Sequence, residues 1–153
     1  MQANETQPQN RLITEQEIKR LTIAWIQGWS PKTQLFTAEE LRPLYAQEPG
    51  EILVIDDFEG GAVVLHSFDE YQREWVTVMQ QFSYWAIQPK GEIQVQVSGD
   101  LAVSMFTWIA EARLKNGAEL QPAPSQHGTL VWRKRNDHWQ IVHEHLTRAR
   151  PDN

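Results

Sequence analysis

Two adjacent carboxylic acids, Asp56 and Asp57, stand at the end of a short apolar run in residues 51–57. A carboxyl group at the mouth of an apolar pocket has a raised pKa and can accept a proton near neutral pH. Neighbouring residues of a strand point to opposite faces, so only one of the two acids can face inward. We expect Asp57 to be that inward, catalytic acid, with Asp56 beside the pocket; the alternative, that both acids form a polar strand end, stays open.

Two histidines, His143 and His145, lie two residues apart near the C-terminal end of the chain. On a strand this spacing places both imidazoles on one face, where they could polarise a carbonyl group or ligate a metal ion. With Asp57 as base, either histidine would suit proton abstraction next to a carbonyl group, or a dehydration. Glu144 points to the opposite face, and it replaces the histidines as the pocket acid if that face lines the pocket.

A metal site needs a third ligand, and His127 is the nearest candidate. If residues 136–137 form a two-residue turn, the expected pairs are Leu130 with His143, Gly128 with His145, and His127 with Leu146. This register places His127 on the face of Glu144, away from the other two histidines. We therefore predict no metal and no other cofactor, and a histidine-based metal hydrolase is the least favoured hypothesis.

Both faces of the last strand carry apolar side chains. Trp139 and Ile141 share the histidine face, and Val142 and Leu146 share the glutamate face. This pattern is expected if one face lines a pocket and the other forms a dimer interface. The pattern leaves open which face does which.

Three capping boxes of the S/T-x-x-E type indicate the helices that must position these groups: Thr14–Glu17, Thr37–Glu40 and Ser67–Glu70. The first opens an amphipathic helix with Trp25 and Trp29 on its apolar face. We expect Trp25 to contact the pocket, with plain core packing as the alternative. The second opens a short helix interrupted by Pro43, and the third opens a longer helix that reaches Phe82.

The hydrophobic period changes from helical to alternating after residue 85. Short strands are expected at 51–57 and 62–66, and four long strands at 92–98, 101–114, 126–135 and 138–148. Because helices come first and an antiparallel meander follows, the order predicts an α+β domain with helices packed on one face of a curved sheet.

The composition limits the class of protein. The chain of 153 residues fits one domain at 13–150, preceded by a polar, disordered tail at 1–12. It contains no cysteine, which excludes disulfides, thiolate metal sites and a cysteine nucleophile. The net charge of −6 disfavours a nucleic-acid partner. No apolar run spans a membrane and the polar N-terminus is no signal peptide, so we expect no membrane partner and a cytoplasmic location.

The final hairpin carries a family resemblance. Its elements are T-x-V-W at Thr129–Trp132, a tight turn, W-Q-I-V-H at Trp139–His143, and the second histidine His145. The hairpin resembles the SnoaL-like branch of the nuclear transport factor 2-like superfamily, and still more closely the association domain of calcium/calmodulin-dependent kinase II. The resemblance implies a cone in which a bent antiparallel sheet wraps around a long N-terminal helix, with two further helices and a pocket at the open end.

The resemblance also has departures that bear on the site. The positions matching the arginines of the kinase pocket are Ile109, Leu130 and Leu146, which implies a more apolar pocket. The first helix lacks the tyrosine of the isomerase branch, so steroid-type isomerisation is not supported. The pocket residues expected from the resemblance and the strand faces together are Trp25, Trp29, Asp56, Ile109, His127, Thr129, Leu130, Glu144 and Leu146.

Two functions follow from this resemblance. The first is a small-molecule-binding protein whose apolar pocket takes an apolar ligand, with isomerase-like or dehydratase-like acid–base chemistry. The second is a non-catalytic oligomerisation or interaction module like the kinase association domain. In either case the resemblance implies self-association through the sheet, most simply as a homodimer.

Overall fold

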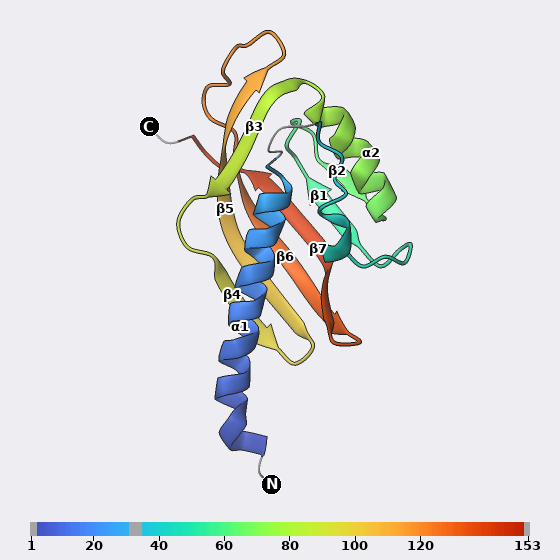
Figure 1. The fold of residues 1–153 in the computed structure, drawn as a ribbon, viewed down its shortest axis with the longest axis vertical. Coiled ribbons are helices and arrows are strands. Elements are labelled where there is room, and N and C mark those ends of the chain that lie inside the picture. Colours follow the sequence, from blue (N-terminus) through green and yellow to red (C-terminus); the bar gives the residue numbers. More distant parts are fainter. Residues whose placement is uncertain (1–2, 31–34, 152–153) are drawn as a thin grey trace.

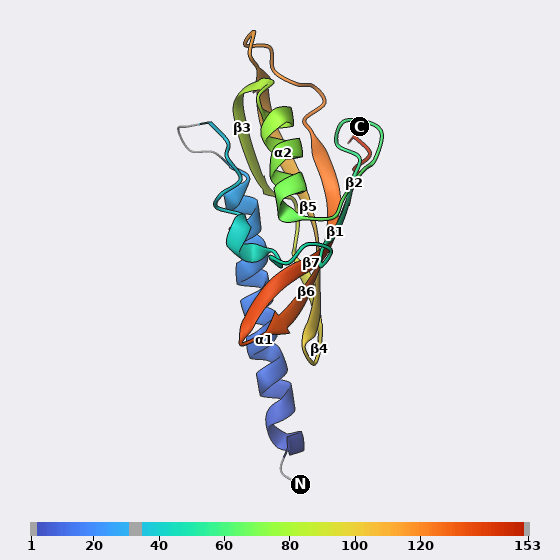
Figure 2. The same ribbon diagram turned by 90° about the vertical axis from the view of Figure 1, so that its right-hand side faces the viewer.

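The computed structural model describes residues 3–30 and 35–151, and it has the predicted α+β architecture. Seven strands form one curved sheet in the order β2-β1-β7-β6-β5-β3, with β4 paired to β5, and α1 and α2 lie against its inner face (Figures 1 and 2). The strands are β1 (Leu53–Asp56), β2 (Val63–Leu65), β3 (Phe82–Pro89), β4 (Gln94–Ser98), β5 (Leu101–Leu114), β6 (Ser125–Arg135) and β7 (His138–Arg148). The helices are α1 (Ala3–Gly28), the 3-10 turn η1 (Arg42–Leu44) and α2 (Phe68–Met79).

The long helix α1 begins at Ala3 and not at Thr14, so residues 3–12, where the composition predicted a disordered tail, are helical. Residues 1–2 of that tail lie outside the described part of the chain. A helix satisfies its own backbone hydrogen bonds, so it can continue into this polar segment, of which residues 8–12 are exposed. Farther along, α1 buries one face against the sheet, with Ile18, Thr22, Trp25 and Ile26, and the buried Trp29 follows directly after its end.

The helix α2 confirms the third predicted helix start, with Ser67 as its N-cap. The Ser67 hydroxyl accepts a hydrogen bond from the Glu70 backbone N–H at 3.1 Å. Pro43 reduces the predicted second helix to the turn η1, because proline cannot donate a helical hydrogen bond. The helix α2 ends at Met79, and residues 82–89, whose first part was predicted helical, form the strand β3.

The register of the final hairpin differs from the predicted one by one residue. The two-residue turn forms as expected, with positive φ at Asn136 and Asp137. However, Val142 is an extra residue in β7, because Trp132 pairs with Ile141 while its neighbour Val131 pairs with His143. This β-bulge gives the pairs Thr129 with His145, Leu130 with Glu144, Gly128 with Leu146, and His127 with Thr147.

The bulge also decides which side chains share a face. His127 now lies on the same face as His143 and His145, which corrects the predicted separation. Ile141 is fully buried and lies on the face of Glu144, not on the histidine face as predicted. Trp139, which pairs with Lys134, lies on the same face as Ile141. The inner face of the sheet is therefore the glutamate face, and the histidines lie on the outer one. The sheet is mixed, because β1 runs parallel to β7.

Candidate functional site

A small aromatic cavity lies between the two helices and the inner face of the sheet. Its volume is about 30 Å³, the space of about one water molecule. It is lined mainly by tryptophans and other apolar side chains, with one carboxyl and one amide: Trp25, Trp29, Asp56, Phe58, Trp75, Val78, Met79, Trp85, Ile87, Trp108, Gln126 and Leu146. Of the expected pocket residues, Trp25, Trp29, Asp56 and Leu146 line this cavity.

The acid at this cavity is Asp56, and not Asp57 as expected. Asp56 ends β1 with only 5% of its surface exposed. Its Oδ1 accepts hydrogen bonds at 2.8 Å from both the Phe58 backbone N–H and the Gln126 Nε2. Burial raises the pKa of the Asp56 carboxyl to about 6, although these two hydrogen bonds oppose the shift. Such a group exchanges protons near neutral pH.

The neighbouring acid Asp57 directly follows β1, and its carboxylate faces the end of β7. Its carboxylate accepts hydrogen bonds from the Arg148 backbone N–H at 2.9 Å and from the Thr147 hydroxyl at 3.1 Å. Gln126 also reaches it, at 3.2 Å, and thereby bridges the two acids. Asp57 thus ties the end of β7 to the loop after β1.

A second buried acid, Glu144, lies on the inner face near the cavity wall. It is fully buried beside Tyr45 and Trp25. The Tyr45 hydroxyl donates a hydrogen bond to Glu144 Oε1. The Trp25 indole N–H donates to the same oxygen, at 3.2 Å, and to the Tyr45 hydroxyl oxygen, at 2.8 Å. Burial raises the pKa of Glu144 to about 8, and the charge of Asp56 adds to the effect, so Glu144 is largely neutral at pH 7.

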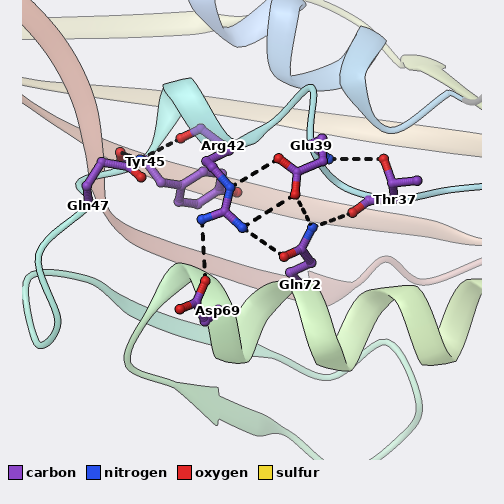
Figure 3. Close-up of polar contacts among 7 residues, drawn as sticks. All are labelled: Thr37, Glu39, Arg42, Tyr45, Gln47, Asp69 and Gln72. Atoms are coloured by element: carbon purple, nitrogen blue, oxygen red, sulfur yellow. Dashed lines mark hydrogen bonds and ion pairs between the residues drawn. The ribbon is translucent and has the colours of Figure 1, made fainter.

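A polar cluster on the surface positions Tyr45 (Figure 3). The Arg42 guanidinium reaches Glu39, Asp69 and Gln72, at distances from 2.8 to 3.5 Å. These contacts join η1 to α2. On the other side of Tyr45, the Ala46 backbone N–H donates to the Ile141 carbonyl at 3.0 Å, which holds this segment against β7. The tyrosine is thereby held between helix and sheet.

The histidines lie away from the cavity, on the outer face. His143 Nδ1 is 2.8 Å from the Leu53 carbonyl oxygen, and His127 Nδ1 is 2.7 Å from the Thr107 hydroxyl. The rings of His143 and His145 are 6.3 Å apart. Within residues 3–30 and 35–151, no group of three histidine, cysteine or acidic side chains could hold a metal ion. The structure therefore does not assemble Asp57 with either histidine at one site.

The remaining expected pocket residues divide between the two faces. Ile109 and Thr129 lie on the outer face with His127, as their strand partners show. Leu130 and Glu144 lie on the inner face but do not line the cavity.

Three of the cavity tryptophans add unused hydrogen-bond donors. The buried indole N–H groups of Trp29, Trp75 and Trp85 have no hydrogen-bond partner among the described residues. Buried donors are normally paired, either with protein groups or with ordered water. The sequence did not predict the roles of Tyr45, Phe58 and Gln126. Only Gln126 carried a signal, as a polar residue at an alternating position in a predicted strand.

No helix in the described part of the chain is both long enough and apolar enough to cross a membrane.

Comparison with known proteins identifies the family. Solved structures share the fold at low sequence identity: a nuclear transport factor 2-like superfamily protein from Salmonella enterica is 20% identical, with 89% of this chain and 91% of that chain covered and a TM-score of 0.73. The association domain of C. elegans CaMKII is 16% identical, with 90% and 98% covered and a TM-score of 0.67. A proposed dehydratase of the same superfamily from Streptomyces avermitilis is 17% identical, with 90% and 97% covered and a TM-score of 0.71.

Sequence comparison gives the direct assignment. No curated protein matches the chain. The profile of the SnoaL-like domain matches residues 58–150, from the loop after β1 to just beyond the end of β7. The chain therefore belongs to the SnoaL-like domain family.

Proposed function

We propose that the protein binds a small apolar carbonyl compound in the tryptophan-lined cavity and that Asp56 exchanges a proton with it. The observation that carries this proposal is a buried carboxyl group with a pKa of about 6 at the wall of an apolar cavity. The unpaired indole N–H groups of Trp29, Trp75 and Trp85 suit a carbonyl oxygen that gains negative charge. Because the cavity holds about one water molecule, a ligand must displace a side chain to enter.

The chemistry is a reversible proton transfer. Ionised Asp56 takes a proton from the carbon next to the carbonyl group, and the C–H electron pair becomes the double bond of an enolate whose oxygen carries the charge. Protonated Asp56 then returns a proton to the same or a neighbouring carbon. In a β,γ-unsaturated ketone, return of the proton to the γ carbon gives an isomerisation. In a β-hydroxy ketone, the enolate expels the hydroxyl group, which takes the proton from Asp56 and leaves as water, and this gives a dehydration.

Hydrogen–deuterium exchange at the carbon next to a ketone tests this step. We expect the protein to accelerate exchange of benzylacetone in D₂O, followed by proton NMR, with a rate that rises with pH through about 6, since only the ionised Asp56 accepts a proton. Asp56→Asn is expected to lower the rate by about 100-fold or more. The control Asp100→Asn, which changes an exposed acid in the turn between β4 and β5, should leave the rate nearly unchanged. An Asp56→Asn protein as active as wild type would refute the proposal.

A second function, self-association through the outer face of the sheet, is favoured by a separate observation. Both helices lie on the inner face, and Leu53, Val64 and Leu101 on the outer face are 37–52% exposed. Association domains of calcium/calmodulin-dependent kinase II are among the structures with this fold. We propose that two copies pack through this face, which would bury these residues.

Light scattering coupled to size exclusion measures the assembly. We expect a mass of at least twice the 17.8 kDa of one chain. Val131→Lys places a charge at the centre of the outer face and should give monomers. The matched change Ile13→Lys, on the exposed side of α1, should leave the mass unchanged. A wild-type protein that is monomeric at micromolar concentration would contradict this second function.

A further inference from the structure

The side-chain amide of Gln126 bridges the two adjacent acids at the end of β1. Its Nε2 donates hydrogen bonds to Asp56 Oδ1 at 2.8 Å and to Asp57 Oδ1 at 3.2 Å. A glutamine amide carries two N–H groups, so one is available for each carboxyl group. The bridge therefore uses the donors of a side chain that is only 2% exposed and lines the aromatic cavity.

The two acids also fix the orientation of this amide. Ionised carboxyl groups only accept hydrogen bonds, so they require the amide nitrogen, and not the amide oxygen, between them. The reversed amide would place its oxygen against the oxygens of both acids. Gln126 is thus held as a donor toward Asp56 and Asp57.

Asp57 holds the far end of the bridge in place. It accepts hydrogen bonds from the Arg148 backbone N–H at 2.9 Å and from the Thr147 hydroxyl at 3.1 Å, both at the end of β7. Gln126 itself belongs to β6, where it pairs with Arg148. The bridge is therefore attached to two neighbouring strands of the sheet.

The two carboxyl oxygens of Asp56 have different environments. Oδ1 accepts two hydrogen bonds, from Gln126 Nε2 and from the Phe58 backbone N–H, both at 2.8 Å. Oδ2 accepts no hydrogen bond from residues 3–30 or 35–151. Because Asp56 lines the cavity, Oδ2 is the oxygen that remains available to a bound molecule.

The direction of this oxygen matters for the proposed reaction. The torsion of an aspartate carboxyl group is broad and roughly two-fold, so an untethered group exchanges its two oxygens by rotation. Two hydrogen bonds to the same oxygen oppose that rotation. Proton transfer from carbon requires close alignment, and an error of about 1 Å in position can lower the rate about 100-fold.

We propose that Gln126 is a positioning residue for the proton transfer: it holds Asp56 Oδ1 and thereby makes Oδ2 the oxygen that exchanges the proton. The C–H bond of the ligand breaks as the Oδ2–H bond forms, and the electron pair stays with the ligand as its enolate. Gln126 exchanges no proton itself. This inference rests on the proposed function and adds the residue and the oxygen atom that direct the reaction.

Gln126→Met separates positioning from an effect on basicity, because methionine has a similar length but no N–H donor. The hydrogen bond from Gln126 lowers the pKa of Asp56, so the midpoint of benzylacetone exchange against pH should rise by about one unit in the variant. A stronger base alone would also raise the limiting rate at high pH. We expect this limiting rate to fall about tenfold instead, because the carboxyl group can turn.

Gln140→Met is the matched control. Gln140 is a half-buried glutamine of β7 that does not line the cavity, so its replacement should leave both the midpoint and the limiting rate unchanged. A limiting rate of Gln126→Met that equals or exceeds that of wild type would overturn the positioning role, even with a shifted midpoint. An equal fall in Gln140→Met would overturn it as well.

Nitrogen-15 NMR tests the bridge in the wild type, and it decides the matter if Gln126→Met does not fold. The side-chain N–H resonances of Gln126 should shift with the midpoint of the Asp56 carboxyl group, near pH 6, because one N–H donates to that group. Resonances that stay constant from pH 5 to 7 would overturn the inference. Titrating resonances in a protein that does not exchange benzylacetone would overturn the proposed reaction and leave Gln126 a structural role alone.

Discussion

Replacing Glu144 with glutamine is expected to make the protein progressively more stable than wild type as the pH rises. The folded state raises the pKa of Glu144 from 4.5 to about 8, so its contribution to stability is fully present below pH 4.5 and is lost as the pH rises through 8. Between pH 6 and 8 the wild type should lose about 2 kcal/mol through this group. Glutamine resembles the neutral acid and keeps an oxygen to accept from Tyr45 and Trp25, so the variant should not have this loss.

Urea unfolding at a series of pH values measures the effect as the difference between variant and wild type. We expect this difference to grow by about 2 kcal/mol from pH 6 to pH 8. Glu40→Gln, which changes an exposed acid, should give a difference that does not vary with pH. A constant difference for Glu144→Gln as well would mean that Glu144 is already ionised at pH 6.

Trp25→Ala is expected to lower the free energy of unfolding by about 4 kcal/mol. The side chain is 2% exposed and packs against Trp29 and Phe106, with centroid distances of 6.0 and 5.3 Å. The change leaves a large cavity in the core and also removes the indole N–H that Tyr45 and Glu144 share. Both effects destabilise the folded state.

Two further variants separate the loss of packing from the loss of the hydrogen-bond donor. Trp25→Phe keeps a ring but loses the donor, and we expect a loss of about 1–2 kcal/mol. Trp139→Ala truncates a half-buried tryptophan at the end of the last hairpin, and it should cost less than half as much as Trp25→Ala. If Trp25→Ala cost no more than Trp139→Ala, the first helix would not be a central part of the core.

Local signals predicted local structure well. The Ser67 cap places the start of α2, and the Asn136-Asp137 turn places the last hairpin, because each depends on hydrogen bonds and dihedral angles within a few residues. The resemblance of that hairpin led to the family. The extra residue Val142 could not be foreseen, since a bulge is set by how the sheet curves over its whole core.

The candidate site depended on this unforeseen geometry. The bulge at Val142 changes the pairing of β6 with β7 by one residue from the predicted register. Because side chains alternate along a strand, His127 therefore lies on the outer face with His143 and His145, and Ile141 lies on the inner face with Glu144. The choice between Asp56 and Asp57 likewise rests on alternation in a strand of four residues, whose phase the sequence does not reveal. Tyr45 reaches Glu144 from 99 residues away, a contact that only the tertiary structure creates.

Carbon-13 NMR titration of the Asp56 carboxyl group, assigned with Asp56→Asn, tests whether this acid is poised for proton exchange beside the cavity. The buried position predicts an inflection near pH 6, which should move higher when phenylbutyramide displaces water from around the carboxyl group. An inflection near pH 4 that the probe leaves unchanged would show a solvated acid, and neither the reaction nor the ligand site could then be centred on Asp56.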